Sequence, residues 1–307
     1  MTRRTFRRLV GVVLLLIAGG LYLTRPERVD PATIPDHAPD LANGERMFWA
    51  GGCASCHAAP GASGEAKLVL AGGLELDTPF GLFRVPNISP SAEHGIGGWS
   101  TGDFLNAMTK GTSPEGLHYY PAFPYGSYRN MTFTDLIDMK AYLDTLPVSD
   151  NQVADHALDF PFSWRSALGG WKLLFLDTTP VPAPPGAGDL AERGAYLVAG
   201  PGHCAECHTP RNLLGGLDTA RWLAGGPNPD GEGRIPDITP APHGIGSWSA
   251  TDIAYYLESG FTPDFDSVGG SMTAVQESWA KLPVADREAV AAYLKTIPPS
   301  PAAAPAD

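Results

Sequence analysis

Apolar residues recur at helical spacing in several short segments of this chain. Leu136, Met139 and Leu143 would lie on one face of a helix, preceded by a Thr132 cap and with Asp135 in the opening turn. The spacing therefore predicts a helix that begins just after Thr132.

Further helices are predicted from the same kind of pattern. One runs through Val290 and Leu294 and is opened by Pro283, and shorter helices are expected at residues 42–49 and 194–198. Long Gly/Pro-rich loops separate these segments, and we find no strand pattern. The predicted fold class is all-α.

Two serines mark further helix starts. Ser100 and Ser249 each stand three residues before an acidic residue, Asp103 and Asp252, the acidic variant of a capping box. A helix is expected to begin after each serine.

The serines belong to a longer internal repeat. Three pairs of words align when the two copies are overlaid, which indicates a tandem duplication. The pairs are VPNISP (85–90) with IPDITP (235–240), HGIGGWS (94–100) with HGIGSWS (243–249), and AYLDTLP (141–147) with AYLKTIP (292–298).

Pro-rich stretches divide the 307 residues into segments. We expect an N-terminal signal anchor or signal peptide, a linker, a first domain with its connecting segment, a Pro-rich linker, a second domain and a flexible tail. Their bounds are 1–25, 26–39, 40–178, 179–188, 189–298 and 299–307.

The N-terminus has the pattern of an export segment. Arg3, Arg4, Arg7 and Arg8 precede an apolar run over residues 9–23. An uncleaved membrane anchor and a cleaved signal peptide both remain open, because the run is short for a membrane span and Ala18-Gly19-Gly20 is only a mediocre cleavage site. Either alternative places the rest of the chain on the periplasmic face of the inner membrane or in the soluble periplasm.

The formal net charge is −12. This acidic balance argues against a nucleic-acid partner and suits a soluble surface or docking on a basic protein.

All four cysteines fall in two copies of one pattern, Cys-x-x-Cys-His. Cysteines at i and i+3 lie on one side of a helical turn, so both thiols can bond to the vinyl groups of a haem while the histidine binds its iron. A thioredoxin motif would need alternating strands and helices, and a zinc ribbon would return to its second pair after roughly 15–20 residues. We therefore expect two covalent haem c groups, held by Cys53, Cys56 and His57 and by Cys204, Cys207 and His208.

Nearly the whole chain after the N-terminal segment resembles the cytochrome c subunits of bacterial membrane-associated alcohol, aldehyde and gluconate dehydrogenases. The resemblance rests on CASCH, YYPAFPYGSYRNMT, FPFSWR, GWKLLF, GHCAECHTPRN and the closing GGSM...LPVADREAVAAYLKTIP. It implies two tandem class I-like cytochrome c domains.

The sixth iron ligand decides what each haem can do, because a methionine closes the iron and gives an electron carrier. Met272 is expected in a loop before the last helix, where small c-type domains supply this ligand. In the first copy Phe123 stands in the corresponding position, and Met131 in the following loop is the preferred candidate. His118 or an open site are the alternatives.

The resemblance also points to three residues around the haem edge and propionates. These are Trp99, Trp248 and Arg211, whose N–H groups can donate to buried carboxylates. Core packing is the alternative role for the two tryptophans.

The expected function is periplasmic electron transfer. The two haems would carry electrons from a partner dehydrogenase subunit to an acceptor in the respiratory chain, with no catalysis by this chain itself. The alternative is a dihaem oxidoreductase, of the peroxidase or sulfur-compound dehydrogenase type, with an open haem in the first domain.

Overall fold

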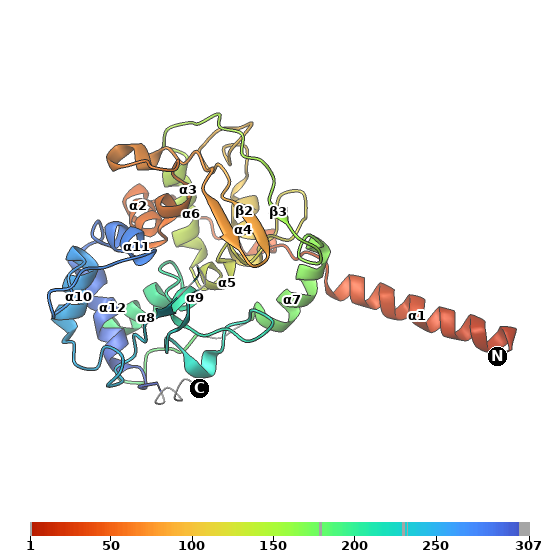
Figure 1. The fold of residues 1–307 in the computed structure, drawn as a ribbon. Coiled ribbons are helices and arrows are strands. Elements are labelled where there is room, and N and C mark those ends of the chain that lie inside the picture. Colours follow the sequence, from red (N-terminus) through yellow and green to blue (C-terminus); the bar gives the residue numbers. More distant parts are fainter. Residues whose placement is uncertain (1, 178–179, 229–230, 232, 301–307) are drawn as a thin grey trace.

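The computed structural model describes residues 2–177, 180–228, 231 and 233–300. Helix α1 (Arg3–Leu23) projects away from the rest of the molecule, with its side chains exposed (Figure 1). By length and composition it could cross a membrane. The expected domain limit at residues 178–179 and most of the expected tail, residues 301–307, lie outside the described residues.

The remaining elements fall into an N-terminal half, up to α7, and a C-terminal half from α8 onward. The N-terminal half contains α2 (Leu41–Ala50), α3 (Cys53–His57), α4 (Thr101–Lys110), α5 (Tyr125–Tyr128), α6 (Phe133–Leu143) and α7 (Leu168–Phe175). The C-terminal half contains α8 (Asp189–Ala199), α9 (Ala205–His208), α10 (Ala250–Ser259), α11 (Met272–Trp279) and α12 (Val284–Thr296). Short 3-10 helices lie at Pro31–Thr33, Gly64–Leu68, Arg165–Ala167 and Thr219–Arg221.

Each half is built on a pair of packed helices, α2 with α6 and α8 with α12. A glycine stands at each crossing. A β-carbon on Gly44 would lie 2.2 Å from the carbonyl oxygen of Asp138, and one on Gly194 would lie 1.9 Å from that of Ala289. The helices therefore approach more closely than any side chain would allow.

The helix starts confirm the caps expected from the sequence. Ser100 with Asp103 and Ser249 with Asp252 form complete capping boxes at α4 and α10. The Thr132 side chain caps α6 by accepting from the backbone of Asp135. Pro283 directly precedes α12.

The expectation of no strands was wrong. Strands β1 (Glu75–Thr78), β2 (Gly81–Arg84) and β3 (Ala157–Leu158) form one small antiparallel sheet, and β4 (Gly226–Pro227) pairs with β5 (Arg234–Ile235). None exceeds four residues, too few for alternating polarity to stand out. The protein is nonetheless mainly helical.

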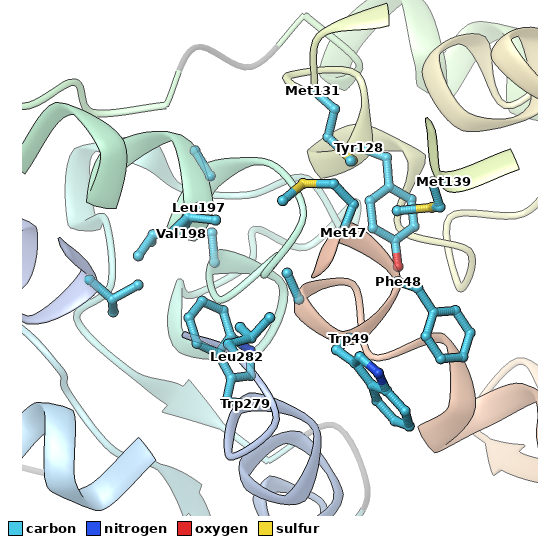
Figure 2. Packing of buried hydrophobic residues seen from close by; sticks show 14 of the residues in the cluster. Met47, Phe48, Trp49, Tyr128, Met131, Met139, Leu197, Val198, Trp279 and Leu282 are labelled. Carbon is cyan, nitrogen blue, oxygen red and sulfur yellow. The ribbon is translucent and has the colours of Figure 1, made fainter. Parts of the chain in front are cut away.

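One hydrophobic cluster extends through both halves. Figure 2 shows Met47 and Trp49 from α2 in the same cluster as Trp279 and Leu282 from the C-terminal half. Helix α11 packs against both α2 and α3. The two halves therefore share a core rather than meeting only through polar surfaces.

A buried ionic cluster also connects the two halves. The Asp286 carboxylate on α12 is 1% exposed and pairs with two guanidinium groups, those of Arg46 on α2 and Arg193 on α8. Because Arg46 belongs to the N-terminal half, this carboxylate holds residues of both halves.

Candidate haem-binding sites

Two short helices carry the Cys-x-x-Cys-His motifs. Helix α3 contains all three residues of the first motif, and α9 contains Cys207 and His208, with Cys204 as its N-cap. All four cysteines are described, and none is in a disulfide. Their thiols therefore remain available for bonds to haem.

Both motif histidines are oriented by the same contact. Nδ1 of His57 lies 2.8 Å from the carbonyl oxygen of Pro86, and Nδ1 of His208 lies 2.8 Å from that of Pro236. A hydrogen bond from Nδ1–H fixes the ring and leaves Nε2 as the metal-binding nitrogen.

Burial lowers the pKa of His57 to about 4, although the bond to the Pro86 carbonyl works in the opposite direction. Burial also lowers the pKa of His208. A neutral imidazole is the form that binds iron, so both rings suit a haem at neutral pH. The two donor sets fit covalent haem c.

A left-handed residue leads into each motif. Gly52, with φ of 59°, precedes Cys53, and His203, with φ of 38°, precedes Cys204. Glycine adopts this left-handed conformation without strain at position 52, whereas the side chain of His203 makes the same conformation sterically unfavourable.

The contacts of His203 cross between the halves. Its Nε2 lies 3.3 Å from the carbonyl oxygen of Gly51, which also accepts a 3.0 Å hydrogen bond from the Tyr128 hydroxyl. The rings of Tyr128 and His203 meet edge-on with centroids 5.6 Å apart. His203, next to the second motif, therefore contacts both Gly51 and Tyr128 of the N-terminal half, and Gly51 lies just before the first motif.

Each haem-attachment segment also makes a hydrogen bond to the opposite half. The hydroxyl of Ser55, inside the first motif, donates to the Ala274 carbonyl on α11 at 3.1 Å. The hydroxyl of Ser127 on α5 donates to the carboxylate of Glu206, inside the second motif, at 2.7 Å.

The candidate sixth ligands differ in their placement. Met272 is partly buried and is the first residue of α11, rather than part of a loop as expected. Met131 lies between α5 and α6, as expected, and is 4% exposed within the shared core.

The alternatives to Met131 have other neighbours. Phe123 packs among the rings of Tyr119, Tyr125 and Tyr128. His118 is buried with Nε2 at 2.9 Å from the carbonyl oxygen of Thr24, at the end of α1.

Of the three residues expected near the propionates, Trp99 lies in the N-terminal half and Trp248 and Arg211 lie in the C-terminal half. Trp99 and Trp248 are partly buried against the shared core, and Trp248 meets the Tyr256 ring with centroids 5.4 Å apart. The Arg211 guanidinium lies in an ion pair with Glu206 and donates to the Gly215 carbonyl at 2.8 Å.

Sequence reasoning did not identify the proline carbonyls that orient the motif histidines, those of Pro86 and Pro236. It also did not identify the contacts of Tyr128 and His203 with the Gly51 carbonyl. The two prolines had a signal, because they stand at the same place in the repeated words VPNISP and IPDITP. The contacts of Tyr128 and His203 join positions far apart in the chain, so no local sequence pattern could have indicated them.

Comparison with known proteins identifies the family of the chain. A family model described as "Cytochrome c" matches residues 41–147. A protein of Cereibacter sphaeroides named "Diheme cytochrome c-type" is 58% identical over 293 residues, which cover 94% of this chain and 97% of that protein. The chain belongs to the cytochrome c family.

Other relatives are named as dehydrogenase subunits. The "Fructose dehydrogenase cytochrome subunit" of Gluconobacter japonicus is 37% identical over 96% of this chain, which spans 60% of that protein. The "Gluconate 2-dehydrogenase cytochrome c subunit" of Pantoea cypripedii is 32% identical over 87% of this chain, which spans 62% of that protein. The chain is thus shorter than these subunits, and the similarity supports a role in electron transfer.

Proposed function

We propose that this protein carries electrons from a partner dehydrogenase subunit to an acceptor of the respiratory chain, using two covalently bound haem c groups. The observation that carries the proposal is the matched orientation of two motif histidines, each held by a proline carbonyl at 2.8 Å. A haem c bound at each site would gain and release one electron.

The chain's own residues hold the two groups in tandem cytochrome c domains, residues 40–178 and 189–298. Cys53, Cys56 and His57 bind the first haem and Cys204, Cys207 and His208 the second. Met131 and Met272 supply the sixth ligands, and Trp99, Trp248 and Arg211 lie near the haem edges. Methionine ligation keeps small molecules off the iron, which suits a carrier.

The contacts between the halves suit electron exchange between the two sites. Gly51, Tyr128 and His203 form a bonded chain from the approach to one motif to the approach to the other. Residues 1–25 act as a membrane anchor or a cleaved signal, which puts both haems on the periplasmic side.

Similarity to named dehydrogenase subunits supports the choice of partner. The partner subunit performs the substrate chemistry and passes electrons to one of the two haems.

Carbon monoxide binding to the reduced, full-length holoprotein tests the proposal. Two methionine-ligated haems predict low-spin spectra in both oxidation states and no change on adding carbon monoxide. If about half of the haem is high-spin and binds carbon monoxide, one iron is open and the carrier assignment fails in favour of a dihaem oxidoreductase.

A further inference from the structure

The turn that carries Met131 is held by the C-terminal half. We call residues Asn130, Met131 and Thr132 the Met131 turn. The backbone N–H of Thr132 donates to the Tyr196 hydroxyl on α8 at 3.2 Å, and the Asn130 side-chain amide donates to the carbonyl of Ala199, the last residue of α8, at 3.2 Å. Both flanks of Met131 are therefore bonded to α8.

The tyrosine contact replaces part of a helix cap. At α10, the backbone N–H of Ser249 donates directly to Asp252 at 2.8 Å, which completes the capping box. At α6 the Thr132 N–H instead meets the Tyr196 hydroxyl, which in turn donates to Asp135. A side chain of the C-terminal half is thus inserted into the cap of a helix in the N-terminal half.

A glycine at the end of α8 allows the Met131 turn to come close. A β-carbon on Gly200 would lie 3.4 Å from Cγ of Met131 and 3.0 Å from the carbonyl oxygen of Tyr196. A side chain here would therefore be tight against the Tyr196 carbonyl, and it would place its β-carbon directly against Met131.

Met272 has a different kind of support. The Gln276 side chain, one turn further along α11, donates to the Glu258 carbonyl on α10 at 2.7 Å. Helix α11 also contacts the N-terminal half, because the Ser55 hydroxyl donates to the carbonyl of Ala274 at 3.1 Å. The described contacts of α11 do not include a hydrogen bond to α8.

We propose that α8 positions the sixth ligand of the first haem, with Tyr196 and Gly200 as positioning residues for Met131. The proposal rests on the function proposed above, in which Met131 binds that iron. It makes the bond between Met131 and iron depend on α8 of the C-terminal half, whereas the bond made by Met272 does not depend on the contacts of Tyr196.

Imidazole competes with methionine for ferric haem iron, so its binding to the oxidised, full-length holoprotein reports how firmly each methionine is held. Met131→Ala and Met272→Ala first identify which absorbance change belongs to which haem. Tyr196→Phe is then titrated, with Tyr293→Phe as the matched control. Tyr293 is also a buried tyrosine of the C-terminal half, with its hydroxyl 2.9 Å from Trp222 Nε1.

Loss of the Tyr196 hydroxyl should raise imidazole affinity at the first haem by roughly two- to tenfold, the worth of one hydrogen bond. Affinity at the second haem should stay at the wild-type value. Tyr293→Phe should leave the first haem unchanged, which separates positioning from general loss of stability. If Tyr196→Phe does not retain haem, Asn130→Ala removes only the contact with Ala199 and should act in the same direction.

Two results would overturn the proposal, and they differ. Wild-type affinity at the first haem in both Tyr196→Phe and Asn130→Ala, with a clear rise in Met131→Ala, would reject the role of α8 and keep Met131 as the ligand. An unchanged first haem in Met131→Ala would reject the ligand assignment itself, and the proposed coordination with it.

Discussion

The two halves of the molecule are built on the same arrangement of two packed helices but differ in the contacts that stabilise it. Both have a glycine at the helix crossing and a proline carbonyl on the motif histidine. The residue whose backbone carbonyl packs against the crossing glycine is Asp138 in the N-terminal half and Ala289 in the C-terminal half.

Asp138 shows what the N-terminal half adds. Its buried carboxylate accepts hydrogen bonds from the Asp40 backbone and the Asn43 amide, both at 2.8 Å, and lies 2.7 Å from His37 Nε2. The crossing at Ala289 needs no such network. The two halves therefore share the contact that orients the motif histidine and differ in the contacts around the helix crossing.

The largest effect is expected from filling the helix crossings. Gly44→Ala and Gly194→Ala would each force a β-carbon into a backbone carbonyl and should lower the free energy of unfolding by about 3 kcal/mol or more, by overpacking. Urea unfolding of the holoprotein measures the loss of stability in both variants. Gly170→Ala, where nothing lies within 4 Å, is the matched control and should cost nothing. A loss below about 1 kcal/mol at either crossing would show that the close approach is dispensable.

Asp286→Ala should have the next largest effect, because it leaves two arginines without their buried partner. The two guanidinium groups are 34% and 30% exposed. We therefore expect a loss of about 2–3 kcal/mol, less than for a fully buried pair.

The loss in Asp286→Ala should be accompanied by faster proteolysis between the halves, because Arg46 and Asp286 hold them together. Unchanged proteolysis would mean that the hydrophobic core alone joins the halves. Asp286→Asn, which keeps part of the hydrogen bonding, should lie between wild type and alanine.

A smaller effect compares the turns before the two motifs. Alanine should be about 1 kcal/mol less stable than glycine at position 203, because an L side chain is strained in the left-handed region. Gly52→Ala should show a similar loss. Urea unfolding of His203→Ala and His203→Gly tests this. Equal free energies of unfolding for the two variants would show that the backbone at position 203 is not strained.

The sequence was most informative where the signal is local. The Cys-x-x-Cys-His motifs, the serine caps and the main helices all depend on residues close together in the chain, and the structure has helices where those patterns predicted them. The repeat also brought Pro86 and Pro236 into register, although hydrogen bonds to proline carbonyls have no signature of their own in sequence.

The contacts between the halves could not be predicted. Tyr196 meets Thr132, and Arg46 meets Asp286, across long sequence separations that no periodicity encodes. The short strands were missed because hairpins of four-residue strands carry too little alternating polarity. The sequence therefore left open the contacts between the two halves and the short strands within each half.

Intact mass spectrometry of the exported protein tests the central claim most directly. The account predicts a mass equal to the polypeptide plus two haem groups, with one haem on the peptide containing Cys53 and Cys56 and the other on the peptide containing Cys204 and Cys207. A fully exported protein with only one haem, or with none, would contradict it.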